Sequence, residues 1–167
     1  ERLPDKMRYY SDITGVKYPY PSYSQIFVQE FAGWQGNMMT STITENMVDD
    51  WVTHKDFRWL WDIVESEALA SQWFGVHIVS SDWQDTWLTK GFSRHLSGLY
   101  NEYKNGKDEY LSYQHNPQLI TYFNDWNVGN IQPVVNTNYE DVSTFVRSNH
   151  PYQHGASILH MQRKELG

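Results

Sequence analysis

Three polar residues stand where a hydrolytic site could be built. Glu67 and Ser71 lie four residues apart in a strongly helical segment, and eighteen residues separate Ser71 from Lys90 in the next one. Side chains at i and i+4 share one face of a helix. A serine nucleophile needs a His or Lys base and an oxyanion hole, and Lys90 could serve as base if burial lowered the pKa of its amine. Taken by themselves, these residues are typical of a solvated polar helix face.

Two predicted helices carry these residues. Apolar side chains on one face predict the first helix from residue 56 to about 74. Ser81-Asp82 can cap a second helix that extends to about residue 103. Gly91 and Gly98 weaken that prediction by about 1 kcal/mol each, unless close packing requires small residues.

The remaining pattern predicts an α+β fold that is mainly helical, with a small N-terminal sheet portion followed by a helical lobe. Ahead of the two helices we expect a helix over 4–13 that ends before Gly15, and strands over 25–31 and 39–44, joined by a connection that contains Gly33 and Gly36. After them we expect a helix over 107–115, a long loop over 116–138 with short helical pieces, and helices over 140–146 and 155–166.

Composition limits the classes of protein. The 167 residues fit one domain, which we treat as a single fragment, with about 1–50 as the sheet part and 51–167 as the helical lobe. The net charge of −7 argues against nucleic-acid binding, and no apolar run is long enough for a membrane span. The chain has no Cys, so cysteine usage does not indicate the redox state of the compartment in which the protein works. It begins at Glu1 rather than Met, so we expect other domains of a longer chain.

Two segments resemble the signatures of a known family. Glu67-Ala-Leu-Ala-Ser-Gln-Trp-Phe-Gly75 and Trp87-Leu-Thr-Lys-Gly-Phe-Ser93 are similar to H-E-x-x-H-Q-W-[WF]-G and W-L-N-E-G-F-[AS] of the gluzincin (aminopeptidase N-type) zinc aminopeptidases. In that family the two His and the later Glu bind zinc, and the Glu of the first motif is the general base. The resemblance implies a thermolysin-like peptidase catalytic domain.

The residues that do chemistry in that family are replaced in this sequence. Glu67, Ser71 and Lys90 occupy the three zinc-ligand positions, and Ala68 occupies the position of the general base. Only Glu67 could still bind a metal, and one carboxylate cannot make a zinc site. The resemblance therefore implies no zinc cofactor here, although the family uses zinc.

The resemblance extends over nearly the whole chain. The segment Phe31-Ala-Gly-Trp-Gln-Gly-Asn37 matches the family's G-x-M-E-N strand, and Gly36 replaces the Glu that grips the substrate's amino group. Near the end, the segment 151–161 resembles Y-x-K-G-A-x-x-L-x-M-L. Tyr152 falls on the tyrosine that stabilises the oxyanion in that family, while His154 replaces the usual Lys. Tyr152 can equally be read as a packed aromatic residue.

Losing a dication leaves a space lined by acceptors. We therefore predict that the Lys90 ammonium occupies roughly the former metal position and pairs with Glu67. A second metal hypothesis rests on His150, His154 and His160, but their spacing fits no standard site.

Two functions remain open from the sequence. The first is a non-catalytic aminopeptidase-like domain that binds a peptide or protein partner or acts as a scaffold, as in a subunit of a general transcription initiation factor that has such a domain without the zinc motif. The alternative is an active aminopeptidase or metallopeptidase-type hydrolase with unconventional site residues, for which Ser71, Glu67 and Lys90 are the candidates.

Overall fold

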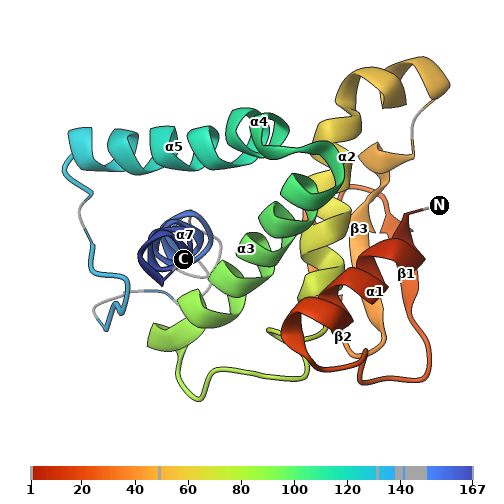
Figure 1. Cartoon of the computed structure of the whole chain (residues 1–167), viewed down its shortest axis with the longest axis horizontal. Coiled ribbons are helices and arrows are strands. Elements are labelled where there is room, and N and C mark those ends of the chain that lie inside the picture. Colours follow the sequence, from red (N-terminus) through yellow and green to blue (C-terminus); the bar gives the residue numbers. More distant parts are fainter. Residues whose placement is uncertain (1, 49, 131, 138–140, 142–149, 167) are drawn as a thin grey trace.

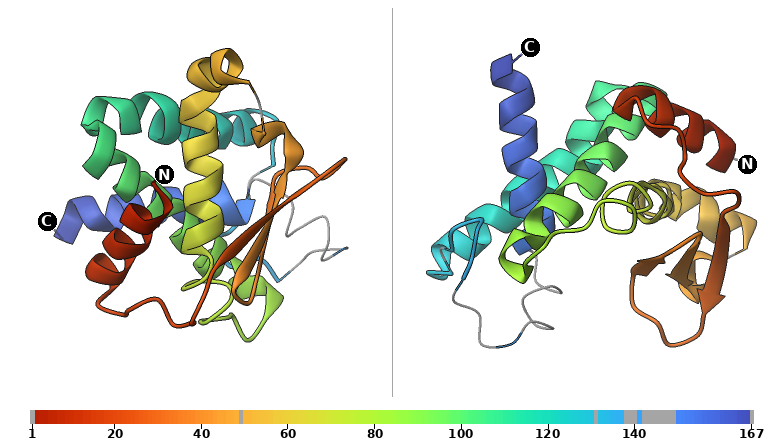
Figure 2. Two further views of the ribbon diagram at one scale, coloured as in Figure 1. Left: turned by 90° about the vertical axis from the view of Figure 1, so that its right-hand side faces the viewer. Right: turned by 90° about the horizontal axis from the view of Figure 1, so that it is seen from below.

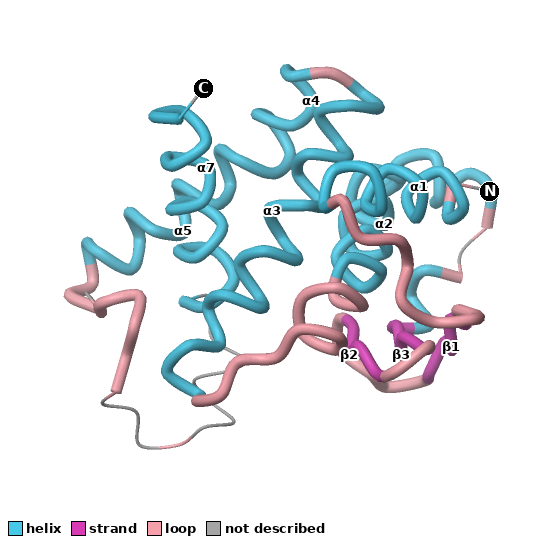
Figure 3. Tube along the Cα trace, turned by 60° about the horizontal axis from the view of Figure 1, so that its bottom comes forward, coloured by secondary structure: helices cyan, strands magenta, loops and turns pink. Residues whose placement is uncertain are grey.

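The computed structural model describes residues 2–48, 50–130, 132–137, 141 and 150–166. A small sheet lies at one side of a larger group of helices (Figure 1, Figure 3), which confirms the predicted α+β, mainly helical fold. The described helices and strands are, in chain order, α1 (Leu3–Thr14), β1 (Ser24–Val28), β2 (Trp34–Asn37), β3 (Thr40–Thr44), α2 (Trp51–Ala70), α3 (Thr86–Asn105), α4 (Lys107–Tyr110), α5 (Asn116–Asn127) and α7 (Gly155–Leu166).

The sheet has the strand order β1-β3-β2, in which β3 pairs in parallel with β1 and antiparallel with β2. Ser41 and Ile43 of β3 are fully buried, and the Ser41 hydroxyl donates to the Ala68 carbonyl of α2 at 3.1 Å. The central strand is therefore attached to the helix that carries the candidate site. The residue pattern placed β2 in a connection, because the strand is short and glycine-containing and depends on pairing with β3, whereas the resemblance matched this segment to a strand of the family.

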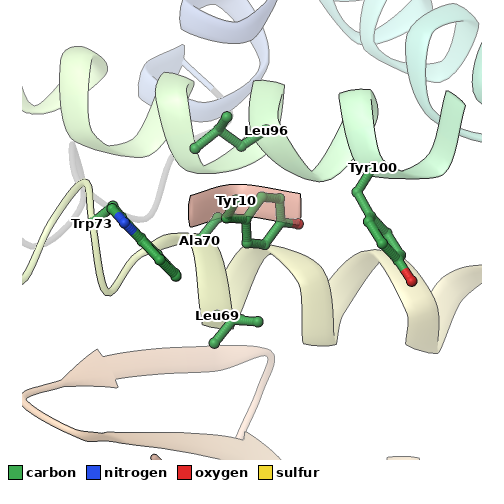
Figure 4. Close-up of a cluster of buried hydrophobic side chains, with 6 residues drawn as sticks. All are labelled: Tyr10, Leu69, Ala70, Trp73, Leu96 and Tyr100. Atoms are coloured by element: carbon green, nitrogen blue, oxygen red, sulfur yellow. The ribbon is translucent and has the colours of Figure 1, made fainter. Parts of the chain in front are cut away.

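The main core joins α1, α2 and α3. Tyr10 of α1 lies between Leu69 and Ala70 of α2 and Leu96 and Tyr100 of α3, with Trp73 alongside (Figure 4). All six side chains are almost fully buried. The Tyr10 ring meets Trp73 edge-on at 5.9 Å between centroids, a favourable aromatic geometry. This core fixes α2 and α3 side by side, so their facing residues can form a site.

Most predicted helices are confirmed, with shifted ends. Helix α1 stops at Gly15, which has the left-handed φ of 69° expected of a glycine cap. Helix α2 begins earlier than predicted, because the Asp50 carboxylate caps it by accepting from the amides of Val52 and Thr53. Helix α7 has the predicted bounds.

The predicted loop over 116–138 is wrong for its first half, which forms α5. Pro117 misled the prediction, since a proline in the first turn of a helix lacks only an amide that would have no partner there. The predicted helix over 107–115 is present as α4 followed by a π-helical turn, Leu111–His115. The predicted helix over 140–146 lies outside the described residues.

Two glycines explain how α7 approaches α3 (Figure 2). A Cβ added at Gly91 would lie 2.9 Å from the backbone of Gly155, and a Cβ at Gly155 would lie 2.9 Å from the Trp87 carbonyl oxygen. Close packing therefore requires the glycine inside α3. No helix within the described ranges is both long enough and apolar enough to cross a membrane.

Candidate functional site

The candidate site lies where α2, α3, β2 and the π-helical turn His150–His154 meet. Helix α2 supplies Glu67 and Ala68, and Ser71 follows at its end. Helix α3 supplies Lys90, β2 supplies Gly36, and the π-helical turn supplies Tyr152. The structure thus brings these elements together: α3 contacts both α2 and the π-helical turn, and β2 contacts α2.

Glu67 is buried and forms an ion pair, but with a residue that the sequence reasoning missed. Its Oε1 accepts from the Arg94 guanidinium, and its Oε2 accepts from the Trp34 indole nitrogen at 3.2 Å. The side chains of Glu67 and Arg94 are 5% and 15% exposed. A carboxylate buried to this extent needs a hydrogen-bonded cation, and Arg94 provides it.

Lys90 lies against aromatic rings. Its ammonium nitrogen is 5.0 Å from the centroid of the Trp34 ring and 5.2 Å from that of Tyr152, distances at which a cation is attracted to the ring face. Burial lowers the pKa of Lys90, while the negative charge of Glu67 raises it. The predicted direct pair between Lys90 and Glu67 is therefore wrong in its cation: Arg94 takes the carboxylate, and Glu67 acts on Lys90 only as a nearby charge.

Arg94 could have been found from spacing. It lies four residues after Lys90, so both project from the same face of α3. Trp34 offered a weaker signal, since it lies in the quoted segment 31–37 but at no position with a catalytic role in the resemblance. These two residues complete the environment of Glu67 and Lys90.

Ala68 and Ser71 supply no catalytic base or activated nucleophile in this arrangement. The Ala68 side chain is fully buried, and the Ser71 hydroxyl donates to the Ala68 carbonyl at 2.7 Å. The Ser71 hydroxyl is not hydrogen-bonded to Lys90 or to Glu67, both of which lie within the described part of the chain. A serine whose proton rests on a backbone carbonyl is not activated for attack.

Gly36 and Ser71 are in direct contact. A Cβ at Gly36 would lie 2.3 Å from the Ser71 hydroxyl oxygen, closer than atoms can approach. A larger side chain at position 36 therefore requires Ser71 to change. Positions 36 and 71 therefore constrain each other's side-chain size.

Tyr152 is held by aromatic contacts. Its ring meets Trp34 edge-on at 6.4 Å and lies beside the Lys90 ammonium. Burial raises the pKa of the Tyr152 phenol to about 12, and the charge of Glu67 adds to the rise. The phenol therefore stays protonated at neutral pH, but the contacts that the structure gives it are those of a packed aromatic residue.

The residues at the former ligand positions do not fit zinc. Zinc sites use three or four nitrogen, sulfur or oxygen ligands in a tetrahedral arrangement. Both carboxylate oxygens of Glu67 are engaged by Arg94 and Trp34, and Lys90 carries an ammonium. Among the residues the structure describes, no group of three or more His, Cys, Asp or Glu could hold a metal ion.

The matching flanks of the first motif have structural tasks. Gln72 is fully buried: its amide nitrogen donates to the Asn37 carbonyl at 2.9 Å, and its oxygen accepts from the Met39 amide at 3.1 Å. Gln72 therefore clamps the β2–β3 hairpin onto α2. Trp73 donates its indole N–H to the Val16 carbonyl at 2.8 Å, which ties the segment after α1 to the core.

The second motif is tied to the first by its flanks. Phe92 of α3 stacks on Phe74 with centroids 4.6 Å apart, and the Ser93 hydroxyl donates to the Phe74 carbonyl at 2.8 Å. The residues that match the family thus hold the two motif segments together, whereas the residues that differ occupy the centre between them.

The peptidase family M1 domain matches residues 1–167. The chain therefore belongs to peptidase family M1, as the resemblance of its motifs predicted. It is 31% identical over 111 residues to transcription initiation factor TFIID subunit 2 of Drosophila melanogaster, a match that covers 66% of this chain and 9% of that protein. It is 24% identical over 169 residues to aminopeptidase A of Gloydius brevicauda, covering 92% of this chain and 16% of that protein.

Solved structures of the family show the same fold. An M1 zinc metallopeptidase from Deinococcus radiodurans, bound to a Tyr-Ser-Ala substrate, superposes with a TM-score of 0.69 at 24% identity, over 98% of this chain and 32% of that one. Yeast LTA4 hydrolase in complex with bestatin gives 0.78 at 18% identity, over 99% and 26%. The chain spans a small part of each of these relatives.

Proposed function

We propose that this chain is a non-catalytic aminopeptidase-like domain, which binds a peptide or protein or acts as a scaffold within a longer protein. The observation that carries the proposal is the group of protein charges at the positions where the family binds zinc. A buried Glu67–Arg94 ion pair and the Lys90 ammonium, set between Trp34 and Tyr152, occupy the centre of the motif region. Positive charge there repels a metal dication instead of binding it.

The chain also lacks the groups that peptide hydrolysis by a zinc peptidase requires. A zinc peptidase needs a metal-bound water and a base to deprotonate it. Ala68 has no titratable group, and the Ser71 hydroxyl donates to a backbone carbonyl. Gly36 removes the carboxylate that would hold a free amino terminus. We therefore propose that the domain uses no zinc cofactor and does not cleave peptides.

The relatives support a role among proteins. TFIID subunit 2 is by its name part of a multi-subunit factor, and the match covers only 9% of its length in Drosophila melanogaster. By this similarity we propose protein partners and additional domains for the present chain. The aromatic surface formed by Trp34 and Tyr152 is the place where we expect a peptide segment to contact the former active site.

The test compares the protein with a variant in which the family's residues are restored. The protein, purified without chelator, is assayed for zinc by mass spectrometry and for hydrolysis of a panel of aminoacyl amides. The control is the quadruple variant Glu67→His, Ala68→Glu, Ser71→His and Lys90→Glu, which restores the ligand set on the same backbone. Arg94→Gln is added to that variant, because the arginine would otherwise face the restored metal.

We expect less than about a tenth of an equivalent of zinc in the unmodified protein, no turnover, and zinc uptake by the restored variant. Zinc uptake by the restored variant would show that the backbone still accommodates the metal and that the side chains exclude it. Stoichiometric zinc in the unmodified protein, with turnover abolished by a chelator, would refute the proposal.

A further inference from the structure

A cavity with a largely polar lining lies away from the motif region, between the end of α3, the start of α4 and the end of α7. Its volume is about 330 Å³, at the lower end of the range for small-molecule sites. None of the residues at the motif positions borders it, and of the three histidines considered above as metal ligands only His160 does. The lining residues are Glu102, Lys107, Tyr110, Leu111, His160, Arg163 and Lys164.

The lining is positive although the protein is acidic. Three cations, Lys107, Arg163 and Lys164, face one anion, Glu102, on a chain whose net charge is −7. Glu102 accepts from one guanidinium nitrogen of Arg163 at 2.5 Å, so the remaining guanidinium nitrogens are still available as donors. The two lysines are exposed and line the cavity from two different helices, Lys107 from α4 and Lys164 from α7. Such an arrangement concentrates small anions.

His160 is a buried polar group on the cavity wall with an unused ring nitrogen. The residue is 8% exposed, and its Nδ1 is 2.9 Å from the Tyr110 hydroxyl. Its Nε2 has no hydrogen-bond partner within the described residues. Burial raises the pKa of Tyr110 to about 12, so the phenol keeps its proton. When Tyr110 donates to Nδ1, the imidazole carries its own proton on Nε2 and offers a donor.

We propose that this cavity binds a small ligand through a tetrahedral oxyanion, a phosphate or sulfate group, held by Lys107, Lys164, Arg163 and the Nε2–H of His160. Tetrahedral oxyanions accept several hydrogen bonds at once, which suits a cavity lined by a guanidinium, two ammonium groups and an imidazole. The volume leaves room for an organic body of modest size beside Leu111. A bulky or strongly apolar ligand does not fit this lining.

Binding should be linked to protonation of His160. In the empty cavity its pKa is lowered by burial first, then by His115, Lys164 and Arg163, against Glu102. A bound dianion adds negative charge beside the ring and raises that pKa. Proton uptake on binding makes the affinity increase as the pH falls. The titratable and charged groups around the ring are Tyr110, His115, His95, Glu102, Lys107, Arg163 and Lys164.

Sodium sulfate is the first probe, because its charge is constant between about pH 6 and pH 8, where histidine titrates. Titration calorimetry at constant ionic strength should detect saturable binding that is stronger at the lower pH. Sulfate is compared with inorganic phosphate, to distinguish the two oxyanions, and with acetate and chloride, which lack the tetrahedral shape. Equal binding of acetate or chloride would overturn the proposal, as would the absence of saturable sulfate binding up to roughly 10 mM.

Paired variants distinguish binding at the cavity from non-specific attraction by the net charge of the protein. Lys107→Gln with Lys164→Gln should weaken sulfate binding roughly ten-fold or more, whereas Lys17→Gln with Lys55→Gln changes the net charge equally and should leave it unchanged. His160→Gln should abolish the pH dependence. The control His115→Gln should retain it, since the neighbouring ring, 4.0 Å away, does not line the cavity. Equal weakening by both lysine pairs, or an unchanged pH dependence in His160→Gln, would also overturn the proposal.

Discussion

Removing Arg94 should strongly destabilise the protein, because the Glu67 carboxylate would then be buried without its cation. The carboxylate is 5% exposed and would keep only the Trp34 indole N–H as a donor, with the Lys90 charge nearby. Breaking a buried ion pair by removing one partner costs about 3–5 kcal/mol. For a protein of this length each kcal/mol corresponds to roughly 2–4 °C in Tm, so Arg94→Leu should lower the Tm by about 6–20 °C.

Urea denaturation at pH 7, followed by tryptophan fluorescence, measures the free energy of unfolding. The matched control is Arg58→Leu, since Arg58 is 51% exposed and pairs with Asp62 at 3.6 Å. We expect it to cost less than about 1 kcal/mol. The double variant Glu67→Leu/Arg94→Leu removes both charges and should be at least about 2 kcal/mol more stable than Arg94→Leu alone.

Two outcomes would refute this reasoning. If the free energy of unfolding of Arg94→Leu is within about 1 kcal/mol of that of the unmodified protein, the Glu67 carboxylate is not buried as described. If the double variant loses as much as the sum of its single variants, the two side chains act independently and form no pair.

Three further predictions concern neighbouring residues. Burial lowers the pKa of Lys90 in the folded state, so the unfolded chain binds more protons. The stability of the unmodified protein relative to Lys90→Met should therefore rise with pH until about pH 10.4. Urea titrations of both proteins at several pH values measure this difference in stability, and a difference that does not change with pH would contradict the prediction. Gly36→Ala should cost about 1–3 kcal/mol, and Ser71→Gly in the same chain should recover most of this loss in thermal denaturation, unless the contact is relieved by other shifts. Gln72→Ala should cost about 1–3 kcal/mol and expose the Met39 amide to hydrogen exchange, whereas an amide still protected would show that another acceptor holds the hairpin.

The sequence predicted the parts of the fold that depend on local pattern. Helix α7 has the predicted bounds, and α1 ends at the glycine expected to cap it, because periodicity and capping are properties of neighbouring residues. The residue pattern missed strand β2, although the resemblance matched its segment to a strand of the family, because this short segment depends on pairing with β3. Helix α5 was missed because Pro117 was interpreted as a helix breaker instead of a first-turn residue.

The resemblance predicted which residues lie in one region, but it did not predict which of them contact one another. The resemblance placed Glu67, Ser71, Lys90 and Gly36 in one region, where the structure also has them. It did not point to Arg94 as the cation for Glu67, because the matched motif ends at Ser93. Which of two buried cations takes a carboxylate depends on distances between helices, and a linear sequence does not contain those distances.

The contact between Gly91 and Gly155 also has a mechanical consequence. No side chain separates the two backbones, so α3 and α7 pack in direct backbone contact at this point. Lys90 precedes one of these glycines and Tyr152 lies just before the other, while the cavity around His160 lies farther along the same two helices. Because the two helices are in backbone contact, a displacement of α7 at that cavity would act directly on the helix that carries Lys90.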